Sequence, residues 1–417
     1  MKVYKFGGAS IKDAEGFRNV CSILQRESPN DLVVVISALG KTTNALEEVV
    51  RAYYNDEAKA KDLFNVVRKH HFDILQELIP NKSNDVYRAL NNLFIEVEWI
   101  LEEDRKESFD YSYDQIVSIG EFASTTIAAA YFNASGLQTK WLDAREFIKT
   151  DEKFREATVD WDKTCSLVNQ HIHQGVGVQL TQGFIGCTIE NFTTTLGREG
   201  SDYTAAILAH CLDAESVAIW KDVDGVLNAD PRYFEHAKLI PSLSYHEAIE
   251  MTYYGATVIH PKTLKPLQNK QIPLYVRSFK QPDKIGTLIH TDMQETELPA
   301  TWVKKVNQML ISISAKDFSF IAEEHLEDIF NVLSCSRIHV NMMQNSALSF
   351  SICIDDGNDK LESCLEQLRD KYKVRTNSDL ELLTVRHYKD GEVNDYLANK
   401  NVLLDQRSRN TIQVIHE

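Results

Sequence analysis

Short apolar runs, separated by glycines and by charged amphipathic stretches, organise the chain up to residue 290. Residues 3–6 and 32–37 are continuous apolar runs rich in β-branched side chains, typical of buried strands in a parallel sheet. Helical periodicity with many charges covers 46–107, broken by turn formers at 80–85, and predicts two or three solvated helices. Further strand-like runs occupy 116–118, 136–143, 177–183, 216–220, 255–262, 272–278 and 286–289. This alternation of strands and helices predicts an α/β domain built from βαβ units.

The pattern changes after residue 290. Residues 291–301 are polar and contain Pro299, so they are interpreted as a linker. Strand, helix, strand, strand, helix and strand are then predicted at 309–314, 318–333, 339–343, 348–354, 359–372 and 374. This order is a βαββαβ unit. Runs at 382–388, 402–406 and 411–415 exceed one unit and predict a second, abbreviated copy, to which residues 302–306 contribute.

Composition narrows the class of protein. The 417 residues are 43% apolar, and the longest apolar run, 32–39, is too short to span a bilayer. The first residues lack the charged and apolar regions of a secretory signal, so we expect neither a membrane span nor a leader. The seven cysteines form no CxxC pair and no zinc spacing, which favours buried reduced thiols and the cytoplasm. A net charge of −16 argues against nucleic acid as a partner, so an anionic substrate needs locally clustered cations.

The segment 193–206 is the strongest candidate for such a site. Gly197 and Gly200 flank Arg198, and Ser201 and Asp202 then stand where helix N-caps are preferred, ahead of an amphipathic helix at 203–212. The unpaired N–H groups of a helix N-terminus favour a phosphate or carboxylate, and an arginine can bind a carboxylate bidentately. Taken alone, the segment is equally well explained as a glycine-rich turn before a capped helix.

Cations beside glycines occur at other strand ends. Lys5 lies near the end of the first strand, one residue before the glycine turn of Gly7 and Gly8, where main-chain N–H groups can approach a phosphate. Lys221 follows the strand at 216–220, at a carboxyl end where open α/β sheets bind ligands. Gly40-Lys41-Thr42 is not a P-loop, because the required earlier glycine is Val35. The segment 246–250 lacks the second histidine of a zinc protease helix, which excludes that class.

Six motifs in order are specific when taken together. They are Lys5-Phe-Gly-Gly, Ser37-Ala with Thr43-Asn44, Ser118-x-Gly-Glu121, Thr181-Gln-Gly-Phe184, Thr194-Thr-Leu-Gly-Arg-x-Gly-Ser-Asp202, and Asp222-Val-x-Gly-Val with Asp230-Pro-Arg232. This set resembles the aspartokinases of the amino-acid kinase superfamily. The resemblance covers residues 2–290, and the tandem ACT arrangement of aspartokinases accounts for the rest.

The resemblance implies a three-layer α/β/α, carbamate kinase-like catalytic domain at 1–290 and a regulatory α+β module of ferredoxin-like ACT domains at 303–417. The first ACT domain would cover 308–377, and the second would be completed by 302–307 and 378–417. It also implies phosphorylation of the β-carboxylate of L-aspartate by ATP with Mg²⁺, and a homodimer or higher oligomer with an amino-acid effector.

The resemblance to aspartokinases also implies a role for each residue that matches a position in a family motif. Lys5 resembles the lysine that neutralises the transferring phosphoryl group, and Asp202 the aspartate that orients it. Arg198 would hold the substrate α-carboxylate and Glu121 its ammonium. Ser37, Thr43 and Ser201 would orient the rest, with Phe184 as a wall. Nucleotide contacts are expected from Lys5, Gly7, Gly8, Ser10, Lys221, Asp222, Leu227, Arg232, Thr257 and Val258; metal ligands stay unassigned.

The chain departs from the family pattern at several positions. Ala9 replaces a frequent threonine, and lysine-sensitive members commonly have threonine at 221 and lysine at 257, where this chain has Lys221 and Thr257. In the first ACT domain, Asn341 and Ala347 stand where an aspartate and a glutamate are usual, and 319–323 lacks a glycine. We therefore expect a weak or absent lysine response; threonine sensitivity, another effector or no inhibition stay open.

Particular residues and motifs distinguish the alternative functions. A family member acting on glutamate, acetylglutamate, carbamate or UMP is the nearest alternative, but Glu121 suits a free ammonium that the last three lack. A silent amino-acid sensor is disfavoured because Lys5, Arg198 and Asp202 are all retained. A kinase–dehydrogenase is disfavoured because no GxGxxG follows a strand and 303–417 is too short for a dinucleotide-binding and catalytic domain.

Overall fold

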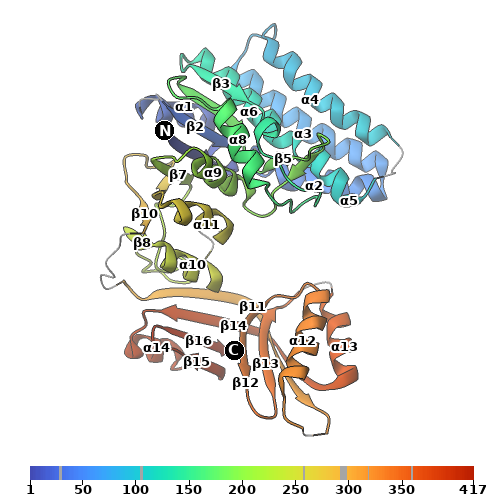
Figure 1. Ribbon diagram of the computed structural model, residues 1–417, viewed down its shortest axis with the longest axis vertical. Coiled ribbons are helices and arrows are strands. Elements are labelled where there is room, and N and C mark those ends of the chain that lie inside the picture. The colour runs from blue at the N-terminus through green and yellow to red at the C-terminus, as the bar shows by residue number, and fades with distance from the viewer. Residues whose placement is uncertain (28–30, 104–106, 257–258, 292–297, 318, 358–359) are drawn as a thin grey trace. The chain divides into compact units, whose positions relative to one another are not determined.

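Most of the strand-like runs of the first part of the chain are strands of one eight-stranded sheet in the computed structural model (Figure 1). Its order is β3-β4-β2-β1-β7-β9-β10-β8, and neighbouring strands are parallel except for β9 and β10. The strands are β1 Lys2–Phe6, β2 Leu32–Ile36, β3 Thr139–Leu142, β4 Val178–Gln182, β7 Ser216–Lys221, β8 Ser242–Ser244, β9 Leu274–Ser278 and β10 Thr287–His290. Every residue of β2 and β4 is buried, as in a sheet covered on both faces.

The structure describes residues 1–27, 31–103, 107–256, 259–291, 298–317, 319–357 and 360–417. Contacts divide the chain into two compact units. The first comprises 1–226, 239–249 and 258–293; the second comprises 227–238, 250–257 and 294–417. The domain and ACT bounds expected from the sequence stay predictions.

The first unit surrounds its sheet with helices. Helix α9 packs on β1 and β7, with α8 and α11 against it, and α6 packs on β2, β3 and β4. Figure 1 shows α3 and α4 side by side, as the periodicity of 46–107 predicts. The helices are α1 Ala14–Arg26, α2 Thr42–Asn55, α3 Glu57–Leu78, α4 Asp85–Glu102, α5 Phe109–Val117, α6 Ile119–Ala134, α7 Ala144–Phe147, α8 Trp161–His171, α9 Gly200–Cys211 and α11 Pro261–Lys270, with the short 3₁₀ helix η1 Gly8–Ile11. Helix α10, Tyr245–Tyr254, belongs to the first unit only up to residue 249. No helix in the described ranges is long and apolar enough to cross a membrane.

Two of the predicted strands are wrong. Residues 116–118 lie at the junction of α5 and α6, because the start of α6 is buried on every side and has no polar face to mark a helical period. The segment 255–262 is also not a strand where it is described: α10 ends at Tyr254 and α11 begins at Pro261. Residues 257–258 lie outside the described residues.

The expectation that all thiols are reduced is wrong as well. Cys165 in α8 and Cys211 at the end of α9 form a disulfide, and the five other cysteines are free. Their sequence separation of 46 residues gave no local signal, because only the packing of α8 against α9 brings them together.

Reduction of this disulfide should destabilise the first unit. Closing a loop of 46 residues restricts the unfolded chain, which the entropy model values at roughly 4 kcal/mol. We expect a reductant to lower the melting temperature by roughly 5–15 °C, and Cys211→Ser to melt at the reduced value with or without reductant. Differential scanning fluorimetry checks this, with the exposed Cys335→Ser as the matched control. Seven reactive thiols in the denatured, unreduced protein would contradict the disulfide.

The second unit contains a six-stranded sheet in the order β12-β13-β11-β14-β16-β15 (Figure 1). All its pairs are antiparallel. Its elements are β11 Thr301–Ala315, α12 Glu323–Cys335, β12 Val340–Asn345, β13 Phe350–Asp355, α13 Leu361–Lys371, β14 Tyr372–Arg386, α14 Asp390–Leu397, β15 Val402–Arg407 and β16 Thr411–His416. The predicted βαββαβ order from β11 to β14 is confirmed, and the apolar faces of α12 and α13 share one core with the sheet.

Strands β11 and β14 each combine two runs that the sequence pattern predicted as separate strands. Residues 302–306 and 309–314 are both parts of β11, while 374 and most of 382–388 belong to β14. The register shifts between Lys305 and Gln308, and Asn307 has φ of +54°. A bulge of this kind inserts polar residues into a strand, so the sequence pattern suggested a break where the backbone continues.

Candidate active site

A buried carboxylate with two lysines forms the centre of the candidate site. Lys5 is the last residue but one of β1, Lys221 ends the neighbouring parallel strand β7, and Asp202 lies in the first turn of α9. Lys5 Nζ lies 2.6 Å from Asp202 Oδ1, and Lys221 Nζ lies 3.2 Å from Oδ2. Two cations on one carboxylate leave a net positive charge, which suits an anionic ligand.

Electrostatics keep this cluster charged. Burial alone would raise the pKa of Asp202, but Lys5 and Lys221 outweigh it and hold the pKa below its usual value. Burial tends to lower the pKa of Lys221, yet Asp202 and Glu199 raise it above its ordinary value. Asp202 and Lys221 are therefore held in their ionised forms near neutral pH, as a preorganised anion site requires.

Glu121 is the second buried carboxylate of the site. It lies in α6 and is 2% exposed, and its Oε1 accepts a hydrogen bond of 3.4 Å from the backbone N–H of Ala38. Its Oε2 has no hydrogen-bond partner among the described residues. Burial raises the pKa of Glu121 to about 8. Ser37, next to Ala38, is anchored through its carbonyl, which accepts from the Ser124 hydroxyl at 2.7 Å.

The turn after β1 leaves no room for a side chain at Gly8. A Cβ on Gly8 would stand 2.6 Å from the carbonyl oxygen of Gly40, so only glycine fits. Gly7 precedes η1, and Ser10 within it is buried with a hydroxyl that has no partner in the described ranges. A Cβ on Gly7 would stand 3.2 Å from Lys5 Nζ, so the glycine turn lies beside Lys5, where the sequence predicts nucleotide phosphates.

Close packing also shapes the wall around Phe184. Phe184 has φ of +71°, and its carbonyl accepts a hydrogen bond from the N–H of Leu196 at 2.8 Å. A Cβ on Gly200 would stand 2.7 Å from the Phe184 ring, and one on Gly183 would stand 2.5 Å from Ser201 Cβ. The motifs 181–184 and 194–202 are therefore brought together.

The predicted N-cap of α9 is wrong by two residues. Glu199, in the left-handed region with φ of 53°, is the N-cap and makes no side-chain cap hydrogen bond. Ser201 and Asp202 instead lie inside the first turn and are buried. Arg198, just before the cap, is exposed and makes no hydrogen bond or ion pair within the described part of the chain.

The other predicted residues lie in several different elements. Thr43 lies in the first turn of α2, and Asp222 is exposed just after β7. Leu227 and Arg232 belong to the second unit, where Arg232 pairs with Asp230 at 2.6 Å. The predicted nucleotide contacts Thr257 and Val258 lie outside the described residues. No group of three or more His, Cys, Asp or Glu that could hold a metal occurs in the ranges described.

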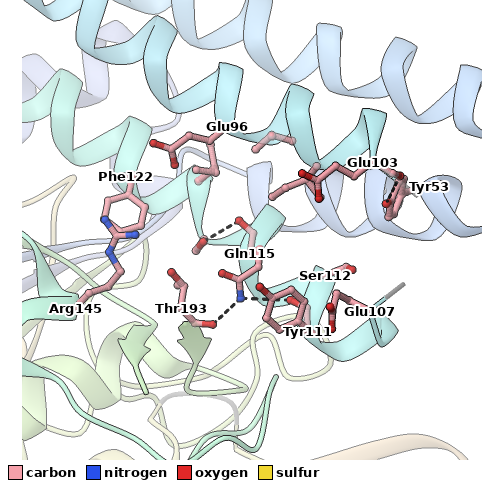
Figure 2. A pocket seen from close by; sticks show the side chains of 14 residues that line it. Tyr53, Glu96, Glu103, Glu107, Tyr111, Ser112, Gln115, Phe122, Arg145 and Thr193 are labelled. Atoms are coloured by element: carbon pink, nitrogen blue, oxygen red, sulfur yellow. Dashed lines mark hydrogen bonds between the residues drawn. The ribbon is translucent and has the colours of Figure 1, made fainter. Parts of the chain in front are cut away.

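A cavity of about 280 Å³ lies elsewhere in the first unit (Figure 2). Its walls come from α4, α5, α6 and the loop between α4 and α5, together with Tyr53 of α2, Arg145 and Thr193. None of the predicted site residues lines it, so the cavity is separate from the lysine–aspartate cluster.

Sequence reasoning missed the buried acid Asp114 of α5. It is fully buried and receives hydrogen bonds from Arg155 and Thr195. An acid that follows Tyr113 and shortly precedes Ile116 and Val117 was the available signal, since an acid buried among such residues must be paired.

Comparisons with known proteins agree with the geometry. A model of the amino acid kinase family matches residues 1–278. Lysine-sensitive aspartokinase 3 of Escherichia coli (strain K12) is 32% identical over 357 residues, which are 85% of this chain and 78% of that protein. The crystal structure of E. coli aspartokinase III in complex with lysine and aspartate (T-state) is 28% identical with a TM-score of 0.84, covering 100% of this chain and 95% of that one. The same enzyme in complex with aspartate and ADP (R-state) also has a TM-score of 0.84 at 28% identity, covering 100% and 96%.

Proposed function

The chain belongs to the aspartokinases of the amino acid kinase family, and from this membership we propose that it transfers the γ-phosphoryl group of ATP to the β-carboxylate of L-aspartate. The product is 4-phospho-L-aspartate, and the reaction is the first step of the aspartate-derived amino-acid pathway (lysine, threonine and methionine). One observation carries the proposal: the ion-paired group of Lys5, Asp202 and Lys221 stands at the carboxyl ends of β1 and β7.

Catalysis would rest on positioning and charge neutralisation, because phosphoryl transfer demands little covalent chemistry from the protein. Lys5 would neutralise the charge that spreads over the transferring phosphoryl oxygens, and Lys221 would assist from the nucleotide side. Asp202 would hold both ammonium groups in place and orient the phosphoryl group.

Aspartate recognition would involve opposite charges at its two head groups. Arg198 is exposed and uncommitted, so its guanidinium can bind the α-carboxylate through two hydrogen bonds. The free Oε2 of Glu121 would accept from the α-ammonium. Ser37, Thr43 and Ser201 would orient the substrate, with Phe184 as an apolar wall.

The nucleotide would place its phosphates on the glycine loop of Gly7 and Gly8, beside the buried hydroxyl of Ser10. An E. coli relative crystallised with aspartate and ADP supports this choice of nucleotide. Mg²⁺ would be held mainly by phosphate oxygens, which suits an ion that keeps several waters. Asp222, Leu227, Arg232, Thr257 and Val258 are further proposed nucleotide contacts.

A coupled ATP-consumption assay tests the activity. We expect turnover with L-aspartate and capture of the acyl phosphate product by hydroxylamine, with no comparable turnover on glutamate, acetylglutamate, carbamate or UMP. Preference for one of those acceptors would reassign the substrate, and no turnover with any would favour a sensor. The proposed compartment is the cytoplasm.

The C-terminal sheet would regulate the enzyme as a tandem ACT module within a homodimer. The E. coli relative crystallised with lysine makes lysine the first effector to consider. In this chain the Asn341 side chain is already occupied: its Oδ1 accepts from Lys305 Nζ at 2.7 Å, and its Nδ2 donates to Gln308 and Asp355. A neutral, committed amide is a poor partner for an added ammonium.

We therefore predict a weak or absent response to lysine. Kinase assays with lysine, threonine and methionine singly should show no strong inhibition by submillimolar lysine. An effector that does act should couple to the active site by about 1–3 kcal/mol. A truncated chain that ends near Ile289 is assayed beside the full-length enzyme and should lose any effector response. Strong inhibition by submillimolar lysine would contradict the argument from Asn341, and identical behaviour of the truncation would contradict a regulatory role.

A further inference from the structure

We propose that Asp114 is a positioning residue for aspartate binding: its buried carboxylate ties strand β6 (Thr193–Thr195) to the 151–158 loop and thereby sets the position of Arg198. The inference rests on the proposed function of Arg198 as the α-carboxylate ligand. Asp114 touches neither substrate head group, so its effect would pass through the backbone.

The carboxylate joins two segments that are distant in sequence. Its Oδ1 accepts from the Thr195 hydroxyl at 2.7 Å, and its Oδ2 accepts from the N–H of Thr195 at 2.9 Å. The N–H of Arg155 donates to both oxygens, at 3.2 and 3.0 Å. Every oxygen is thus used, and a single side chain on α5 fixes two backbone segments.

The same two segments also contact one another directly. The N–H of Ala157 donates to the carbonyl of Thr195 at 2.9 Å. A Cβ on Gly197, which has φ of +75°, would stand 3.3 Å from the Arg155 carbonyl oxygen. The backbone on which Arg198 is mounted therefore rests on the loop that Asp114 holds.

From β6 the chain reaches the site within a few residues. Leu196 donates to the Phe184 carbonyl at 2.8 Å, Arg198 follows, and Gly200 packs on the Phe184 ring. Arg198 itself makes no hydrogen bond or ion pair among the residues described, so its backbone must orient it. Displacement of β6 would move Arg198 directly, while Lys5 and the glycine loop belong to β1 and its following turn.

Complete burial of the Asp114 carboxyl group is energetically unfavourable for its charged form. It has no exposed surface, and burial raises its pKa to about 6 despite the hydrogen bonds from Arg155 and Thr195 that lower it. An apolar residue would leave those buried donors unpaired, so the acid is explained by the donors that it satisfies.

Helix α5 makes a second contact with the same strand. The side-chain amide of Gln115 donates to the Thr193 carbonyl at 2.8 Å, as Figure 2 shows beside the cavity. Asp114 and Gln115 thus hold opposite ends of β6. Gln115 is partly exposed and makes only one hydrogen bond to β6, so its loss should have the smaller effect.

The test compares Asp114→Ala with Asp114→Asn. An asparagine amide can accept both backbone N–H groups with its oxygen and donate to the Thr195 hydroxyl with its nitrogen, so it keeps the geometry without the charge. We expect Asp114→Ala to raise the KM for aspartate by about 10-fold or more, with the KM for ATP nearly unchanged, and Asp114→Asn to restore most of the loss.

Gln179→Ala is the matched control, since Gln179 is also fully buried and satisfies a loop backbone at His173, away from β6. It should lower stability without a selective change in the KM for aspartate. Equal changes in both KM values for Asp114→Ala, or an asparagine variant as poor as alanine, would overturn the proposal. If Asp114→Ala does not fold, Gln115→Ala is the milder variant to test. In that case, a KM for aspartate that is the same in Gln115→Ala as in the wild type would overturn the proposal.

Hydrogen exchange separates this inference from the proposed function. Amides of residues 193–199 should exchange faster in Asp114→Ala than in Asp114→Asn, whatever the wild type catalyses. A wild type without aspartate-dependent turnover would refute the proposed function alone. Unchanged exchange over 193–199 in Asp114→Ala would refute the role of Asp114.

Discussion

Replacing Lys5 by methionine should lower kcat by about 10²–10³-fold or more while the protein stays folded. The ammonium of Lys5 is needed mainly when charge spreads over the transferring phosphoryl group, and methionine retains the length and the apolar stem. The fold should survive because Asp202 keeps Lys221 as a partner at 3.2 Å, so no buried charge is left alone.

Steady-state kinetics and thermal melting check this prediction. Lys2→Met makes the same chemical change on an exposed residue of the same strand and should leave kcat unaltered. A Lys5→Met enzyme that keeps more than about a tenth of the wild-type kcat has lost less than about 1.4 kcal/mol of transition-state stabilisation. The role assigned to Lys5 would then be wrong.

Truncation of Arg198 or Glu121 to alanine should damage the use of aspartate far more than the binding of ATP. Both side chains are expected at the amino-acid head group, and neither is committed to a strong partner in the described structure. Arg198→Lys should rescue poorly, because a point charge cannot reproduce the planar fork that binds a carboxylate. Calorimetry that shows lost ATP binding and normal aspartate binding would mean that the two subsites are exchanged.

Glu121 adds a dependence on pH. Its pKa of about 8 means that the unliganded carboxyl is largely neutral at neutral pH, whereas the ammonium of aspartate needs the ionised form. The KM for aspartate should therefore fall as pH rises from about 6.5 to about 8.5, and Glu121→Gln should lose this trend. Glu96→Gln, on the neighbouring helix α4, is the control. A wild-type KM that is flat over this range would contradict the assignment.

The titration of Glu121 should also make the stability of the folded protein depend on pH. Its folded pKa is raised above the unfolded value of about 4.3, so stability that is present below that value is lost as pH rises towards about 8. Glu121→Gln removes the titration. Its melting temperature should exceed that of the wild type near pH 8, and the difference should shrink towards pH 4.5.

Local patterns in the sequence were enough to predict most of the central sheet and the chemistry at its edge. The strands β1, β2, β4 and β7 follow from continuous apolar runs, and Lys5 and Lys221 follow from cations placed at strand ends. These features depend on residues within a few positions of one another. The helices over 46–107 and the βαββαβ order after the linker were predictable for the same reason.

Only the tertiary structure decided the features that join distant segments. The sequence did not reveal that Asp202 is shared by Lys5 and Lys221, that Cys165 meets Cys211, or that Asp114 holds Thr195 across 81 positions. It also misassigned 116–118, because a helix buried on all sides has no polar face, and it divided β11 at a bulge. Side-chain pairing and burial on every face arise from packing between segments, which no local period encodes.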